Sequence, residues 1–335
     1  MATIKDVAKV AGVSVATVSR VINKSPKASD SSIEAVTHAM SKLGYRPNAA
    51  ARALVSQNTN TIGVLVSDVS DSFFGTLVKA VDSVAHEHGK HILIGNGYHR
   101  AEEERNAIEL LINNRCDSLV IHSKGLSDEE LIGFAKEVKG MVLINRYIPE
   151  LAERCISLDN YQGAYLATEY LIQHGHTKIA CIASTHKIED ASQRIEGYLA
   201  ALRDHDISLP NSYIEYGEPN GDGGELAMAN LLTKSLDATG IVAYNDYMAA
   251  GALSVLDENN IKVPEQVSIM GFDDGLIARY IYPRLSTVRY PIQIMADKAA
   301  RLALALASSE HADNESAIFA PTLVHRNSVA HTNKR

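Results

Sequence analysis

The sequence predicts two different structures in one chain: an all-α helix-turn-helix head, and behind it an α/β body of two doubly wound lobes. Two observations lead to this prediction. Two short helical segments flank a glycine turn near the N-terminus, and from residue 60 onward short apolar runs alternate with helical segments in two successive sets. A chain of 335 residues that is 46% apolar is also long enough for two or three lobes with a sizeable core.

The head begins with two short helices, over residues 4–11 and 15–23. Gly12 between them can adopt the left-handed backbone of a tight turn, and Ser14 can cap the second helix. The apolar spacing of the second helix places Val18, Val21 and Ile22 on its inner face. The side chains left to face outward are Val15, Ala16, Thr17, Ser19 and Arg20. Small apolar groups, hydroxyls and an arginine are typical of a helix that enters the DNA major groove.

A third helix and an alanine-rich segment complete the head. Ser31 and Glu34 have the spacing of a capping box. The helix behind them ends at Gly44, and its apolar stripe consists of Ile33, Val36, Met40 and Leu43. Pro47 then opens an alanine-rich segment that favours a helix but has no broad apolar face. We therefore expect this segment to form a helix that needs a partner outside the chain.

Charge separates the head from the body. Residues 1–58 contain eight Lys or Arg and three acidic residues, a net charge of +5, whereas the whole chain carries −8. The remainder of the chain is therefore strongly acidic. A basic head on an acidic body directs one end of the molecule toward phosphate groups.

The body repeats one pattern twice. In the first set we expect strands at 61–66, 91–95, 118–122 and 140–144, with helices near 74–88, 102–114 and 127–137. In the second set we expect strands at 178–183, 213–216, 240–243 and 267–271, with helices near 162–174, 190–205, 223–233 and 247–259. This alternation predicts two parallel sheets covered by helices, with a cleft between the two lobes.

Polar and aromatic residues follow the predicted strands, where open α/β sheets bind their ligands. Amide and carboxylate oxygens accept paired hydrogen bonds from vicinal hydroxyls, arginine offers a planar fork of donors, and phenylalanine packs on the apolar face of a pyranose. The candidates are Asp71, Phe73, Phe74, Asn145, Arg146, Arg194, Asn245 and Asp273. A glycine-rich anion loop is missing from these positions. The set therefore favours a neutral, hydroxyl-rich ligand.

Simpler roles are open for several of these residues. Asn245 and Asp273 could cap helices, and Asp246 and Asp274 are the first candidates for that role. One of the two adjacent phenylalanines could belong mostly to the core. Arg194 could be a solvated helix residue. The joint occurrence of such residues at five strand ends favours a ligand site.

The run from Thr3 to Asn23, together with Tyr45-Arg46-Pro47-Asn48, resembles the lactose/galactose repressor family of bacterial transcription regulators, and within it the galactose branch. The motifs Arg194-Ile195-Glu196-Gly197-Tyr198, Tyr244-Asn245-Asp246 and Gly271-Phe272-Asp273-Asp274 extend the likeness along the chain. Asn145 stands where the family often has an acidic residue. The resemblance implies a type I periplasmic-binding-protein-like body whose chain crosses between the lobes near 159–162, 288–291 and 318–322.

The resemblance also implies the domains and site residues. The DNA-binding domain spans 1–46, a hinge helix and linker 47–58, and the sugar-binding and dimerisation body 60–330. One lobe comprises about 60–159 and 291–318, and the other about 162–288 and 322–330. The implied DNA-binding residues are Thr3, Ser14, Val15, Ala16, Thr17, Ser19, Arg20, Asn23, Asn48, Ala51 and Leu54, with Leu54 as an apolar wedge in the minor groove. Tyr290 joins the ligand-binding set at the position between the lobes.

We thus expect a repressor of sugar utilisation genes that leaves its operator DNA when a small-molecule sugar inducer, D-galactose on this resemblance, enters the cleft. No cofactor is expected. The alternatives within the family are another hexose or a corepressor such as a purine, although the chain has no Trp to stack on one. The sequence leaves no room for a C-terminal heptad helix, so we expect a homodimer. Its N-terminus has no secretory leader and no apolar run reaches about 18 residues, which predicts a cytoplasmic protein without a membrane segment.

Other kinds of site are weaker. An enzyme that uses Asp71 or Asp273 as a base would lack a second carboxylate placed by the sequence. The run His86-Glu87-His88-Gly89-Lys90-His91 departs from the His-Glu-x-x-His metal motif. Glu102-Glu103-Glu104 suits a solvated helix start. The three scattered cysteines, Cys116, Cys155 and Cys181, indicate reduced thiols and no zinc site.

Overall fold

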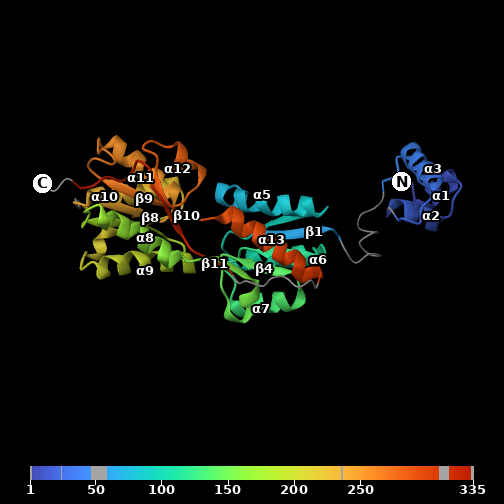
Figure 1. Ribbon diagram of the computed structural model, residues 1–335, viewed down its shortest axis with the longest axis horizontal. Coiled ribbons are helices and arrows are strands. Elements are labelled where there is room, and N and C mark those ends of the chain that lie inside the picture. Colours follow the sequence, from blue (N-terminus) through green and yellow to red (C-terminus); the bar gives the residue numbers. More distant parts are fainter. Residues whose placement is uncertain (1, 24, 47–58, 235–236, 309–316, 333–335) are drawn as a thin grey trace. The chain divides into compact units, whose positions relative to one another are not determined.

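The computed structural model describes residues 2–23, 25–46, 59–234, 237–308 and 317–332. The chain divides into two compact units, Met1–Thr59 and Asn60–Arg335 (Figure 1). The first unit is the all-α head and the second is the α/β body, so the predicted fold class is confirmed. In the described part of the chain, no helix combines the length and the apolar character needed to cross a membrane.

The head contains α1 (Ile4–Ala11), α2 (Val15–Ile22) and α3 (Asp30–Leu43). Gly12 ends α1 with a φ of 68°, the left-handed conformation that its sequence position predicts. Ser14 caps α2 by accepting a hydrogen bond from the backbone N–H of Thr17 at 3.1 Å. The three helices enclose a small apolar core of Val7, Ala8, Val18, Val36 and Ala39.

Two details of the third helix differ from the prediction. Its cap is Ser29, whose hydroxyl accepts from the backbone N–H of Ser32 at 3.3 Å, and Ser31 lies inside the first turn. Ile33 is 42% exposed, and Ala39 occupies the buried position beside Val36. The reason is that α3 packs closely on α1, and this contact favours a small side chain.

The first lobe, here the N-lobe, is built on a six-stranded parallel sheet in the order β11-β5-β4-β3-β1-β2. Its strands are β1 (Thr61–Val66), β2 (His91–Asn96), β3 (Ser118–Ile121), β4 (Met141–Ile144), β5 (Cys155–Leu158) and β11 (Ala317–Phe319). Its helices are α5 (Ser72–Glu87), α6 (Ala101–Asn113), α7 (Asp128–Glu137) and α13 (Ile292–Ser308). A 3-10 helix over Pro149–Arg154 precedes β5.

The second lobe, here the C-lobe, has a six-stranded sheet in the order β12-β10-β9-β8-β6-β7, with only the β10–β12 pair antiparallel. Its strands are β6 (Ile179–Ser184), β7 (Ile214–Gly217), β8 (Gly240–Ala243), β9 (Ser268–Asp273), β10 (Ser286–Arg289) and β12 (Thr322–Val324). Its helices are α8 (Asn160–Gln173), α9 (Glu189–Asp204), α10 (Gly221–Thr233), α11 (Asp246–Glu258) and α12 (Leu276–Tyr280), with a 3-10 turn at Asn211–Tyr213.

Helices cover both faces of each sheet. In Figure 1, α8 and α9 pack together on one face of the C-lobe sheet, and α10 and α11 on the other. In the N-lobe, α13 packs against α5. The side chains of β1 alternate accordingly: Ile62, Val64 and Val66 enter the core on the α5 side, and Leu65 enters the core beneath α6.

The chain passes between the two sheets three times: between β5 and α8, between β10 and α13, and between β11 and β12. Each lobe is therefore built from segments that are not contiguous in the sequence. Several elements near these passages were absent from the sequence prediction, namely β5, α12, β10, α13, β11 and β12. The strands among them have only three or four residues, and α13 follows Pro291 rather than a Ser, Thr, Asp or Asn, so their local signals are weak.

Candidate functional site

The side of α2 that the sequence predicts to face outward is exposed in the structure. Val18 is completely buried, whereas Val15 is 41% exposed and Ala16 and Arg20 are also exposed. Thr17 and Ser19 are half-buried beside them. This side of α2 therefore combines small apolar groups, hydroxyls and one guanidinium without weakening the core.

Two further predicted DNA contacts, Thr3 and Ser14, also cap helices of the head. Thr3 and Asp6 form a capping box at the start of α1, in which the Thr3 backbone N–H donates to Asp6 Oδ2 at 2.8 Å. Ser14 caps α2, and its hydroxyl lies 2.9 Å from that of Thr17. Asn23 is exposed just beyond the end of α2. The remaining predicted contacts lie outside the described residues: Asn48, Ala51 and Leu54.

The body contains a cleft of about 1020 Å³ lined by both lobes. Eight of the nine predicted ligand residues line it: Asp71, Phe73, Phe74, Asn145, Arg194, Asn245, Asp273 and Tyr290. They come from the carboxyl ends of β1, β4, β8, β9 and β10 and from α5 and α9. The topology therefore brings together residues that lie up to 219 positions apart in the sequence, from Asp71 to Tyr290.

Arg194 is buried and held on several sides. Its guanidinium carbon lies 3.6 Å from the ring centre of Phe272 and 4.5 Å from that of Tyr244. Its Nε donates to Asn160 Oδ1 at 3.0 Å, and one terminal nitrogen donates to the Tyr244 carbonyl at 2.6 Å. The other terminal nitrogen lies 3.8 Å from Asp273 Oδ1. Arg194 is thus a fixed donor inside the cleft, not a solvated helix residue.

Two polar residues, one directly after β4 and one at the end of β9, have unusual backbones. Asn145 has a φ of 57° and Asp273 a φ of 109°, both in the left-handed region that L-residues rarely adopt. Such strained residues concentrate at functional sites, where the surrounding fold holds them. Burial raises the pKa of Asp273 well above its usual value, against the opposing effect of Arg194.

The helix-capping alternative holds for some residues and not for others. Asn245 caps α11 through the Met248 backbone N–H at 2.8 Å, and Asp71 caps α5 through that of Phe73 at 2.8 Å. Asp273 caps no helix, since α12 begins at Leu276 after Gly275 and has no side-chain cap. Asp246 accepts from Thr287 and from the Gly275 backbone, and Asp274 pairs with Arg289 and Arg326. The capping role predicted for Asp246 and Asp274 is therefore wrong, because their side chains bind other residues of the C-lobe and neither caps a helix.

An aromatic wall closes one side of the cleft. The rings of Phe73 and Tyr290 meet edge to face at a centroid distance of 4.9 Å, and those of Phe73 and Phe74 at 5.2 Å. Phe74 is the more buried of the two phenylalanines, at 6% exposure. It therefore belongs mostly to the core, and Phe73 is the ring with more surface free.

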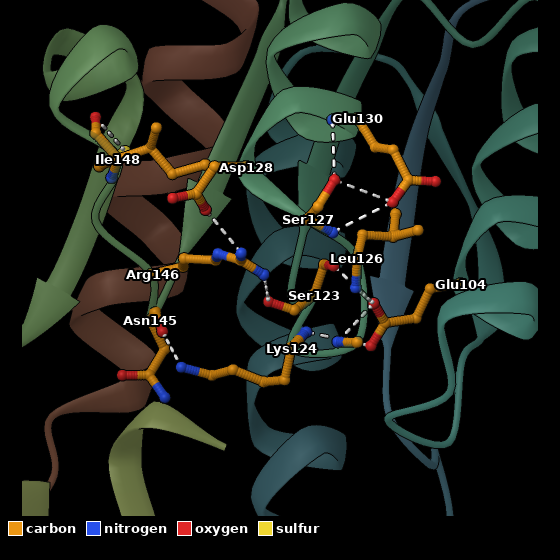
Figure 2. Close-up of polar contacts among 12 residues, drawn as sticks. Glu104, Ser123, Lys124, Leu126, Ser127, Asp128, Glu130, Asn145, Arg146 and Ile148 are labelled. Carbon is orange, nitrogen blue, oxygen red and sulfur yellow. Dashed lines mark hydrogen bonds and ion pairs between the residues drawn. The ribbon is translucent and has the colours of Figure 1, made fainter. Parts of the chain in front are cut away.

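Arg146 is the predicted ligand residue that the fold does not bring to the cleft. Figure 2 shows its guanidinium directed toward Asp128, with an N···O distance of 2.6 Å, and a second bond to the Ser123 carbonyl at 3.3 Å. Its neighbour Asn145 lines the cleft instead. Consecutive residues at a strand end point to different sides, so only one of the pair reaches the ligand space.

The family comparisons assign the chain. Residues 3–48 match the family model described as bacterial regulatory proteins of the lacI family, and residues 168–329 match a periplasmic binding protein-like domain. The regulator GalR of Escherichia coli strain K12 is 54% identical over 330 residues, which are 98% of this chain and 96% of GalR. The chain belongs to the LacI family.

Other relatives agree with this assignment. The regulator GalS of Salmonella typhimurium strain LT2 is also 54% identical, over 98% of this chain and 97% of GalS. A crystal structure of the lac repressor dimer bound to operator and the anti-inducer ONPF superposes with a TM-score of 0.86 at 25% identity, covering 98% of this chain and 99% of that one. This LacI-family protein is therefore a DNA-binding transcriptional regulator and not an enzyme, as its sequence predicts.

The regulator also has cleft residues that sequence reasoning missed. Asp190 of α9 accepts from Lys124 Nζ at 2.5 Å and from Asn145 Nδ2 at 2.6 Å, which joins the two lobes. His99 and His122 line the N-lobe side of the cleft. His122 and Lys124 follow β3, so the search for polar residues after strands could have found them; Asp190 begins a helix and carries no such signal.

One acidic residue that seemed solvated is buried. Glu104 is 1% exposed, and its carboxylate accepts from the Ser123 hydroxyl at 2.5 Å and from the backbone N–H groups of Lys124, Gly125 and Leu126 at 2.9–3.1 Å (Figure 2). It thereby fixes the 123–126 loop that carries Lys124 toward Asn145. The expectation of a solvated face holds for Glu102 and Glu103 and is wrong for Glu104.

Buried polar atoms without a partner concentrate in the cleft. Among the described residues, five buried side-chain polar atoms make no hydrogen bond, and four of them belong to residues that line it: His99 Nδ1, His122 Nδ1, Asn145 Oδ1 and the Tyr290 hydroxyl. Folded proteins satisfy most buried polar groups, so such a concentration indicates a site completed by a ligand. The described residues hold no group of three or more His, Cys, Asp or Glu suited to a metal ion.

Proposed function

We propose that this protein represses galactose utilisation genes and leaves its operator when D-galactose occupies the cleft. The observation that carries the proposal is the set of unpartnered polar atoms beside Arg194, Asn245 and Asp273, next to an aromatic wall. Together these groups match a ligand with several hydroxyls on a ring that has one apolar face. The 54% identity to GalR and GalS supports the same ligand class.

The charges in the cleft argue for a neutral ligand. Six aspartates line it against four cationic side chains, Lys79, Arg194, Arg279 and Arg289. Arg194 is already engaged by Asn160 and the Tyr244 carbonyl, and Arg279 and Arg289 lie against Asp274. An anionic ligand would face more carboxylates than free cations. A planar purine would favour parallel stacking on aromatic rings, whereas Phe73 and Tyr290 pack edge to face at 84°. A neutral hexose therefore fits the cleft better than a phosphate ester or a purine corepressor.

The head is proposed to read DNA through α2. Arg20 would donate to a guanine or a phosphate, and Val15 and Ala16 would contact thymine methyl groups, with Thr17 and Ser19 beside them. Thr3, Ser14 and Asn23 would contact the DNA backbone, because hydroxyl and amide groups can donate to phosphate oxygens. Asn48, Ala51 and Leu54 would contribute from the 47–58 hinge. Residues 1–46 and 60–330 are the proposed DNA-binding and effector-binding parts.

Contacts across the cleft suggest how the two events are coupled. Ser72 and Tyr247 lie 3.0 Å apart across it, and Lys124 and Asn145 meet Asp190. A sugar that binds both walls would favour a closed arrangement of the body, and operator affinity would fall with this closure. The coupling must be reciprocal, so operator DNA should weaken sugar binding by the same factor.

A homodimer is the proposed assembly, with two heads at the spacing of a near-palindromic operator. Large apolar side chains are strongly exposed within residues 276–282: Leu276 at 63%, Tyr280 at 83% and Tyr282 at 95%. Concentrated exposure of this kind is typical of an interaction surface. We propose that a second copy of the chain covers it, and sedimentation at micromolar concentration would test for a dimer rather than a monomer or tetramer.

Operator binding during a galactose titration tests the proposed function. A labelled operator is followed by fluorescence anisotropy at fixed salt, with D-galactose in one series and D-glucose in another. We expect salt-sensitive DNA binding that weakens at least tenfold with D-galactose. If DNA binding responds to a different hexose, or is strengthened by a purine, that molecule replaces D-galactose as the effector. The absence of specific DNA binding would overturn the proposal.

A further inference from the structure

The N-lobe wall of the cleft contains two imidazoles with unused hydrogen-bonding capacity. His99 lies in the segment after β2 and His122 directly after β3, and both line the cleft. His122 is 3% exposed. The Nδ1 atoms of both rings are buried and have no partner among the described residues.

The two rings have fixed positions. His122 packs edge to face on Phe74 at a centroid distance of 4.9 Å, and His99 lies 6.3 Å from Phe74 and 5.7 Å from His122. His99 also meets His186 of the C-lobe at 5.4 Å. Rings held on several sides offer their nitrogens in set directions, which is what selective recognition requires.

Burial also sets their protonation state. It is the main cause that lowers the pKa of His99 to about 4 and that of His122 well below its usual value, and the positive charge of Lys124 acts in the same direction. A neutral imidazole presents one donor and one acceptor. A hydroxyl group can use both, whereas a phosphate or carboxylate ligand can use only the donor.

We propose that His99 and His122 are specificity-determining residues, each recognising one hydroxyl of a neutral aldohexose on the N-lobe wall. The inference rests on the proposed function and extends it, because it identifies which part of the cleft distinguishes one hexose from another. A buried polar group left unpaired penalises a ligand that lacks the matching hydroxyl.

Deoxygenated sugars provide the test. The affinities of D-galactose and its 2-, 3-, 4- and 6-deoxy derivatives are measured by calorimetry for the full chain and for the His122→Leu and His99→Leu variants. We expect each variant to bind D-galactose about tenfold or more weakly. For one deoxy sugar, the variant and the unmodified chain should bind equally, because the hydroxyl that the imidazole contacts is already missing. The deoxy sugar that is bound equally should be a different one for His99→Leu than for His122→Leu.

The controls separate recognition from packing. His86→Leu changes an exposed histidine of α5 outside the cleft and should leave all five affinities unchanged. Operator affinity without sugar and the thermal melt should show that each variant folds. If His122→Leu does not fold, His122→Asn retains a small polar group and should still change the preference among the deoxy sugars.

The outcomes also separate this inference from the proposed function. An equal loss for D-galactose and all four deoxy sugars would mean that the imidazoles act only through packing, while the repressor function would stand. If the unmodified chain binds none of the sugars, both proposals fail. The assignment is supported if each variant binds one deoxy sugar as tightly as the unmodified chain does and binds the other sugars more weakly than the unmodified chain.

Discussion

Lys124 Nζ and Asp190 Oδ1 lie 2.5 Å apart, although Lys124 belongs to the N-lobe and Asp190 to the C-lobe. Their side chains are only 2% and 8% exposed. Burial alone raises the pKa of Asp190, but the positive charges of Lys124 and Arg194 outweigh it and keep that pKa below its ordinary value. The two lobes are therefore joined by a buried ion pair at the edge of the cleft.

Removing the cation of this pair should destabilise the body. In Lys124→Met, Asp190 keeps the amide of Asn145 but loses its charged partner, and an uncompensated buried charge costs about 3 kcal/mol. Urea unfolding should show this loss. The double variant Lys124→Met/Asp190→Asn should recover most of it, because no charge is then left unpaired.

The matched control for this pair is Lys136→Met, which removes an exposed lysine of α7. It should change the free energy of unfolding by less than about 0.5 kcal/mol. Strictly additive losses in the double variant would show that the two side chains do not stabilise each other, and would contradict the ion pair as a link between the lobes.

Glu104 and Glu103 offer a second comparison, since they are neighbours on α6 with opposite environments. Glu104→Gln replaces one acceptor oxygen by a donor facing backbone N–H groups, so we expect a loss of about 2 kcal/mol in the free energy of unfolding. Glu103→Gln should change it little. Equal effects of both substitutions would mean that the carboxylate of Glu104 does not hold the 123–126 loop.

Arg20→Ala tests the exposed side of α2. The exposed guanidinium contributes no core contact, so we expect the head to remain folded and operator affinity to fall by about 1–3 kcal/mol. Lys42→Ala removes the same charge from the last turn of α3 and serves as control. Anisotropy with a labelled operator compares the two; a greater effect of Lys42→Ala would contradict the use of α2 as the reading helix.

Stability should depend on pH through His99. Burial, with smaller effects of His186 and Lys124, lowers its pKa to about 4, whereas the unfolded chain has a pKa of about 6.5. Between these values the unfolded state binds a proton that the folded state does not, so acidification favours unfolding by up to about 1.4 kcal/mol per pH unit.

His99→Gln removes this contribution. The variant should therefore gain stability relative to the unmodified chain as the pH falls from 7 to 4.5, because its free energy of unfolding decreases less. His86→Gln is the control, because its imidazole is exposed in α5. A relative stability of His99→Gln that stays constant over this range would show that His99 is not held neutral by the fold.

Local patterns in the sequence determined most elements and their sides. Gly12 and Ser14 set the turn between α1 and α2, and the apolar spacing of α2 alone placed Val18 inside and Arg20 outside. The apolar runs of β1 and β8 are strands within the predicted ranges. Such features depend on contacts between residues close in sequence, so a single chain is sufficient to predict them.

Part of the cleft could also be predicted from local sequence patterns. Asp71, Asn145 and Asn245 follow strands and Asp273 ends one, and a parallel sheet brings the ends of its strands to one edge. The sequence does not predict which of two consecutive residues at a strand end reaches the cleft. Asn145 lines the cleft and Arg146 turns to Asp128, because the backbone at the end of β4 directs consecutive side chains to opposite sides.

The tertiary structure alone decided the contacts between distant residues. Glu104 is buried because the 123–126 loop folds over it, and Asp190 meets Lys124 because the chain passes between the lobes three times. Neither residue differs in type or local spacing from solvated acids at other helix starts. Burial and ion pairing depend on which segments the fold brings together, and that information lies in the packing of the whole chain rather than in any short stretch of it.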